Sequence, residues 1–182
     1  MARLILLNGP PASGKSTLAR RYAADHAGTL ILDIDLIRRR INGWQADQHR
    51  SGLLAREIAI DLARGHLAAG GEVLVPQFLA RPEFIERLAR LAEESTVEFR
   101  ELALLGDREA MLRRFAARSA AAAEPAHVEA AEQVARDGGM AALADSYDRL
   151  LALLETRPNV RRVASIDGDV ELTYRHLLRA LT

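Results

Sequence analysis

The chain has 182 residues, of which 49% are apolar and 27% charged, enough for one folded domain with a sizeable core. Its 25 basic and 25 acidic residues give a formal net charge of zero, which disfavours nucleic acid or an anionic membrane as a partner. It has no cysteine, which excludes disulfides and thiolate metal sites, and no apolar run approaches the roughly 20 residues of a membrane helix. With no secretory pattern at the start, we expect a cytoplasmic monomer or homodimer with a single domain over residues 1–182.

The first predicted elements surround a glycine-rich turn. The apolar run 4–7 predicts a buried strand, and residues 15–26 predict a helix. Between them, residues 9–16 read Gly-Pro-Pro-Ala-Ser-Gly-Lys-Ser, a full match to the P-loop pattern G-x-x-x-x-G-K-[ST]. A second buried strand over 30–32 leads into Asp33, and the helix that begins near Asp35 ends at Asn42-Gly43.

The rest of the chain continues the alternation of strands and helices. Strands are predicted over 73–75, 97–105 and 160–166, and helices over 51–69, 82–94, 108–123, 128–136, 140–155 and 172–181. In the helix over 51–69, one apolar stripe holds Leu54, Ile58, Leu62 and Leu67. This order of elements predicts an α/β fold whose five-stranded parallel sheet is covered by helices on both faces.

The P-loop pattern predicts a site for a nucleoside triphosphate with Mg²⁺. Gly9 and Gly14 let the backbone bend around an anion, and the positive end of the following helix dipole lies at the same place. Lys15 is the chain's one lysine, and a compact ammonium suits the outer phosphates better than a planar guanidinium does. The Ser16 hydroxyl is expected to bind Mg²⁺. The expected nucleotide contacts are Gly9, Pro11, Ala12, Ser13, Gly14, Lys15, Ser16 and Thr17.

Two carboxylates follow the second predicted strand. If extended backbone continues through them, Asp33 and Asp35 face the same way, toward the crevice at the carboxyl ends of the strands. We expect Asp33 to hold Mg²⁺ through water and Asp35 to accept the proton of an attacking hydroxyl, with both contributing to catalysis. The alternative is that one of them caps the helix that follows.

This succession of strand, P-loop, helix and a strand ending in Asp-x-Asp resembles the small P-loop kinases with an AAA-type ATP-binding domain. Shikimate kinases, zeta-toxin-like kinases and chloramphenicol phosphotransferases are such enzymes, and Leu6-Leu7-Asn8-Gly9 is particularly similar to the last two. The resemblance implies a three-layer P-loop NTPase fold with sheet order 2-3-1-4-5, ATP and Mg²⁺ as cofactors, and transfer of the γ-phosphate to a hydroxyl of a small molecule. GTP as donor, a nucleotide-sugar or RNA acceptor, and a nucleotide-dependent regulatory protein remain alternatives.

Two arginines and one aspartate are further candidates on the donor side. Arg114 and Arg118 are four residues apart and share one face of a helix, as a solvated basic face also would. In the resembling kinases such a pair opens a lid, expected here around residues 114–128, which implies that Arg114 contacts the nucleotide base and Arg118 the transferring phosphate. Arg113 is an alternative to either. Those kinases also place the loop after strand five against adenine, which implies a contact for Asp167, although an ordinary turn has the same sequence.

The acceptor is expected beside Asp35, with Arg38, Trp44 and Gln77 as further contacts. Arg38 can pair with an anionic group, and Trp44, the one tryptophan, can form a pocket wall or pack in the core. Gln77 departs from the resembling kinases, many of which have an acid or glycines at the end of the third strand. It can bind substrate or a metal-bound water but brings no charge, so Asp33 is left as the acidic partner of the metal.

Overall fold

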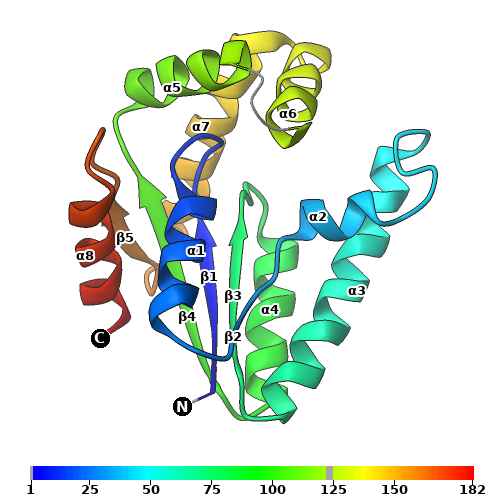
Figure 1. Cartoon of the computed structure of the whole chain (residues 1–182), viewed down its shortest axis with the longest axis vertical. Helices are drawn as coiled ribbons and strands as arrows, with labels where there is room; N and C mark the ends of the chain where they lie inside the picture. The colour runs from blue at the N-terminus through cyan, green and yellow to red at the C-terminus, as the bar shows by residue number, and fades with distance from the viewer. Residues whose placement is uncertain (1, 122–124) are drawn as a thin grey trace.

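A computed structural model describes residues 2–121 and 125–182 of the chain. Five parallel strands form one sheet in the order β2-β3-β1-β4-β5 (Figure 1). In chain order these strands are β1 Arg3–Asn8, β2 Thr29–Ile31, β3 Glu72–Gln77, β4 Glu98–Leu105 and β5 Arg161–Ala164. The order is the one that the resemblance implied, and the predicted α/β class with five parallel strands is confirmed.

Helices cover both faces of this sheet. They are α1 Lys15–Asp25, α2 Ile34–Arg39, α3 Gln48–Ala68, α4 Pro82–Glu94, α5 Arg108–Ala121, α6 Pro125–Arg136, α7 Gly139–Glu155 and α8 Val170–Leu181. The central strands are buried on both sides, so alternate residues of β1 enter different cores: Leu4 and Leu6 pack toward α3 and α4, while Ile5 and Leu7 pack toward α1 and α8. Together the two cores make a three-layer arrangement.

The buried face of α3 differs from the predicted apolar stripe. Leu54, Ile58 and Leu62 are all exposed, and of the four predicted residues Leu67 alone is buried. The buried face is instead lined by small residues, which include Ala55, Ala59 and Ala63. Alanine lets the helix axis approach its neighbours closely, and this close packing determined the orientation of α3 more than side-chain hydrophobicity did.

The carboxyl ends of the strands meet at one edge of the sheet, where the P-loop follows β1 (Figure 1). Helices α5, α6 and α7 rise beyond this edge, and α5 packs on α7 through Met111, Phe115, Leu143 and Tyr147. The lid predicted around 114–128 falls on the end of α5 and the start of α6, and its residues 122–124 lie outside the described part of the chain. None of the helices described is both long enough and apolar enough to span a bilayer.

Candidate active site

The P-loop joins β1 to α1 through a backbone that few residues can adopt. A Cβ at Gly9 would lie 2.6 Å from the carbonyl oxygen of Leu104, so no side chain fits there without movement of β4. Gly14 precedes α1 with φ 96°, and Ala12 has φ 61°, in the left-handed region that costs a non-glycine residue energy. The loop thus bends tightly at the amino end of α1, which is the geometry that receives an anion.

A buried asparagine fixes where this loop starts. Asn8 is fully buried, and its side-chain oxygen accepts hydrogen bonds from the backbone N–H of Gly9 at 2.8 Å and of Leu79 at 2.9 Å. Its amide nitrogen donates to the carbonyl oxygen of Leu79 at 2.9 Å. One side chain therefore ties the first P-loop residue to the segment that follows Gln77 on β3.

The ammonium of Lys15 lies within the P-loop, where it donates to the carbonyl oxygens of Gly9 and Pro10, both at 2.8 Å. Burial lowers its pKa to about 7, and the positive charge of Arg118 acts in the same direction. The negative charges of Asp35 and Asp33 oppose this shift in pKa. Two cations and two carboxylates from three separate elements therefore lie close enough to act on one another.

The structure gives Asp33 and Asp35 different local environments. Extended backbone ends at Asp33, which caps α2: its Oδ1 accepts from the backbone N–H of Asp35 at 3.0 Å and of Leu36 at 3.2 Å. Burial raises the pKa of Asp33, and the charge of Asp35 adds to this rise. Asp35 lies in the first turn of α2, half exposed, with its carboxylate 3.3 Å from the guanidinium of Arg38. Asp33 is therefore the residue that caps the helix, as the alternative foresaw. Extended backbone does not continue through Asp35, so the condition for both carboxylates to face the same way is not met.

The residues expected to hold Mg²⁺ fit that ion. Ser16 is exposed in the first turn of α1, and cap bonds occupy only one oxygen of Asp33. No group of three or more His, Cys, Asp or Glu suited to a metal occurs among residues 2–121 and 125–182. Mg²⁺ in nucleotide sites needs no such group, because one or two protein oxygens suffice when phosphates and water supply the rest. The hydroxyl of Ser16 and the carboxylate of Asp33 are donors of the required type.

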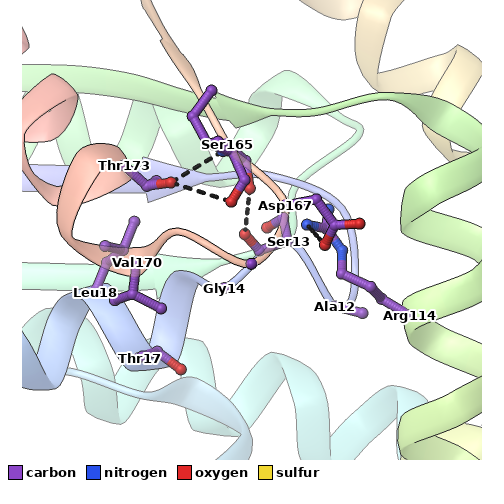
Figure 2. Close-up of a pocket in the computed structure, with 12 residues that line it drawn as sticks. Ala12, Ser13, Gly14, Thr17, Leu18, Arg114, Ser165, Asp167, Val170 and Thr173 are labelled. Carbon is purple, nitrogen blue, oxygen red and sulfur yellow. Dashed lines mark hydrogen bonds and ion pairs between the residues drawn. The ribbon is translucent and has the colours of Figure 1, made fainter.

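A cavity of about 170 Å³ adjoins the P-loop on the side of α8 (Figure 2). Six of the predicted nucleotide contacts line it, namely Ala12, Ser13, Gly14, Thr17, Arg114 and Asp167. The guanidinium of Arg114 and the carboxylate of Asp167, 53 residues apart in sequence, form an ion pair of 3.1 Å across its rim. The structure therefore brings the two candidates from α5 and from the loop after β5 into one wall.

Sequence reasoning missed the residues that attach this loop to the P-loop. The Ser165 hydroxyl donates to the carbonyl oxygen of Ser13 at 3.1 Å, and the Thr173 hydroxyl accepts from the backbone N–H of Ile166 at 2.9 Å (Figure 2). Single serines and threonines in turns give no signal in sequence that distinguishes such a contact. They hold the loop after β5 against the phosphate-binding turn.

The three lid arginines separate in space. Arg114 reaches the cavity beside the P-loop, whereas the Arg118 guanidinium stacks over Phe115 at 5.5 Å and is near enough to Lys15 to lower its pKa. Arg113 is largely exposed and faces Glu109, 3.8 Å away on the same helix. Arg114 and Arg118 thus lie on the side of the P-loop, Arg113 lies on the solvent side, and the contacts of the first two with a nucleotide stay predictions.

On the other side of the P-loop, the predicted acceptor residues fall into two groups. Arg38 stacks over the ring of Trp44 at 5.0 Å and lines, with Trp44, a second cavity of about 310 Å³. Trp44 is 9% exposed, so it both packs and contributes a wall. Gln77 is not part of that wall. Its side-chain oxygen, at the end of β3, is buried and accepts no hydrogen bond from the residues that the structure describes.

A P-loop at the carboxyl edge of a 2-3-1-4-5 sheet, with arginine-bearing helices above it, defines a nucleotide-binding protein with a kinase-like P-loop fold. A family model described as an AAA domain matches residues 4–137, so the chain belongs to that family.

Three individual proteins are similar to the chain, one in sequence and two in structure. Over 89 residues, 49% of the chain, the sequence is 37% identical to the adenylate kinase of Thermococcus gammatolerans, and the match spans 34% of that protein. The chain also matches the crystal structure of a candidate kinase from Chloroflexus aurantiacus, with a TM-score of 0.67 and 17% identity. It matches the tunicamycin resistance protein of Deinococcus radiodurans with a TM-score of 0.61 and 15% identity. Both structural matches cover 99% of this chain and 94% of the other.

Proposed function

We propose that the protein is an ATP-dependent kinase that transfers the γ-phosphate to a hydroxyl group of a small molecule. The observation that carries this proposal is the arrangement at the phosphate cradle: the Lys15 ammonium donates to the carbonyl oxygens of Gly9 and Pro10, both at 2.8 Å, and Arg118, Asp33 and Asp35 lie near enough to shift its pKa. Cations beside a polyphosphate stabilise the charge on the moving phosphoryl group. The half-exposed carboxylate of Asp35 supplies a base near this cradle, which binding of nucleotide alone would not require.

In this proposal the charged groups divide the work between them. The Asp35 carboxylate takes the proton of the acceptor hydroxyl while the new oxygen–phosphorus bond forms at Pγ. The bond from Pγ to the bridging oxygen breaks, and its electron pair leaves with ADP. Lys15 and Arg118 hold the negative charge on the phosphoryl oxygens. Ser16 and Asp33 would hold Mg²⁺, which would supply positive charge beside the terminal phosphates.

The remaining residues position the two substrates. The cavity with Arg114 and Asp167 receives the nucleotide base, for which we propose adenine. The unsatisfied oxygen of Gln77 needs a donor, because a buried acceptor without a partner costs about 1–3 kcal/mol. The acceptor hydroxyl or a metal-bound water supplies such a donor, so we assign Gln77 to acceptor positioning.

The variant Asp35→Asn tests the proposed base. An amide cannot take up the proton, so kcat should fall by about 10²–10⁴-fold while ATP affinity stays near that of the native protein. Turnover is followed by mass spectrometry as the gain of one phosphoryl group in a metabolite panel, and affinity by calorimetry with ATP and Mg²⁺. Arg38→Gln breaks the same ion pair but keeps the carboxylate, so it should retain far more of kcat than Asp35→Asn does, although the acceptor KM can rise because Arg38 is a proposed acceptor contact. Full turnover in Asp35→Asn would refute the assignment.

A further inference from the structure

The second cavity lies between the acceptor side of the P-loop and helix α6. Its walls come from α2, the loop after α2, the start of α3 and one face of α6, namely Arg38, Trp44, Gln45, Gln48, Glu129, Glu132, Gln133 and Arg136. An ion pair of 2.9 Å between Arg39 and Glu129 joins α2 to α6 beside it. Arg38 connects the cavity to the candidate base, because its guanidinium lines the wall and also contacts Asp35.

The charges that line this cavity compensate one another. Two arginines and two glutamates give a formal charge of zero, and each has an opposite charge nearby. Arg38 faces Asp35 at 3.3 Å, Glu129 faces Arg39 at 2.9 Å, and Arg136 faces Glu132 at 3.8 Å. A phosphate-bearing acceptor would need arginines whose charge is available to it, since bidentate arginine contacts are what hold phosphate groups in proteins. In this wall both arginines already face a carboxylate, so a phosphate would have to compete with Asp35 and Glu132 for them.

The neutral groups of the wall suit hydroxyls. Gln45 and Gln48 each present an amide, which both donates and accepts, as a hydroxyl does. The Gln133 amide is already engaged with Asp137 at 2.8 Å. Trp44 adds an apolar wall. A volume of about 310 Å³ lies at the lower end of the range that small-ligand pockets occupy, about 300–1,000 Å³.

We propose that this cavity binds the acceptor and selects an uncharged, polyhydroxylated molecule over a phosphorylated one. The inference rests on the proposed kinase activity and names the substrate class for it. It also gives α6 a part in specificity, because half of the wall residues named above belong to that helix. A nucleotide acceptor, which the partial similarity to an adenylate kinase would suggest, is not expected.

The test counts phosphorus atoms in the product. Native protein is incubated with Mg²⁺, ATP and matched acceptors, each an uncharged compound and its phosphorylated form: adenosine and AMP, uridine and UMP, glucose and glucose 6-phosphate. A fractionated metabolite extract is tested separately. A product with one phosphorus atom supports the inference. Products that carry two or more overturn it while the proposed kinase activity stands. No product from any acceptor overturns the proposed function and this inference with it.

The location is tested with neighbouring residues at the start of α3. Gln48 lines the cavity, whereas His49 is exposed and does not. For the uncharged acceptor identified in the first assay, Gln48→Ala should raise KM by about 2–10-fold, which is the effect of one neutral hydrogen bond. The KM of ATP should stay unchanged. His49→Ala should change neither KM. Equal acceptor KM values in native protein and Gln48→Ala, with both variants folded by circular dichroism, would remove the acceptor from this cavity.

Discussion

The charge of Lys15 depends on what occupies the P-loop. Without nucleotide, burial and Arg118 hold its pKa at about 7, well below the ordinary value of a lysine, so at neutral pH the ammonium is only partly protonated. A bound triphosphate favours the protonated form strongly. Nucleotide binding above pH 7 is therefore expected to take up a proton.

This gives a prediction about pH. As pH rises above about 7, the fraction of free protein with a charged Lys15 falls, so ATP affinity should weaken by up to about tenfold per pH unit. At pH 6 the lysine is already protonated and uptake should be small. Calorimetry at pH 8 in two buffers of different ionisation enthalpy measures the uptake, expected to approach one proton per ATP. Heats that do not depend on the buffer at pH 8 would contradict the lowered pKa.

Gly9 sets a second requirement at this scale. In Gly9→Ala the new Cβ would lie 2.6 Å from the carbonyl oxygen of Leu104, and backbone cannot move aside easily. We expect a loss of about 1–3 kcal/mol in the free energy of unfolding. Gly52→Ala is the control, because Gly52 lies inside α3 with open space around it and should stabilise by about 0.4–1 kcal/mol. Urea denaturation measures both, and a Gly9→Ala protein as stable as native would contradict the close packing.

At the scale of the element, the residue that caps α2 has two proposed roles. Asp33 caps the helix and is also our candidate partner of Mg²⁺. Its raised pKa means that the folded protein disfavours the charged carboxylate relative to the unfolded chain. The charge is therefore retained at some cost to stability, as expected of a group that serves a ligand.

Two substitutions separate these roles. Asparagine caps helices about as well as aspartate, so Asp33→Asn should keep or slightly raise the thermal stability of the nucleotide-free protein while lowering its affinity for Mg²⁺ in the presence of ATP. Asp33→Ala loses the cap as well and should cost about 0.5–2 kcal/mol. Thermal unfolding with and without Mg²⁺ and ATP distinguishes them. If Asp33→Asn gained as much stability from Mg²⁺ as native protein does, Asp33 would have no part in holding the ion.

Helix α3 shows where a sequence pattern misleads at this scale. Apolar residues at intervals of four and five predicted the buried stripe, yet Leu54, Ile58 and Leu62 face solvent. The alanines of the neighbouring stripe have weak hydrophobicity individually, but they let α3 pack closely against the core that contains β3 and α4. Which of two apolar stripes is buried depends on the shape of the neighbouring surface, and one helix's sequence does not contain that information.

At the scale of the whole molecule, local spacing predicted the parts of the site that are continuous in sequence. The P-loop followed from eight consecutive residues, and the pair Arg114 and Arg118 from helical periodicity. Contacts between distant segments were beyond reach: nothing in the sequence pairs Arg39 with Glu129, and no pattern places α6 against the loop that holds Trp44. Arg38 on α2 was named from the sequence as a candidate acceptor contact, whereas its neighbours on α6 could be found only from the fold.

The side chain of Asn8 has a consequence for both substrates at once. It bonds to the first residue of the P-loop and, through Leu79, to the segment just after Gln77. In the proposed reaction this amide would fix the spacing between the P-loop, which is expected to hold the donor, and the segment after Gln77 on the expected acceptor side. Under that proposal part of the alignment of the two reactants belongs to the scaffold, and loss of the Asn8 amide is expected to lower kcat more than the affinity for either substrate.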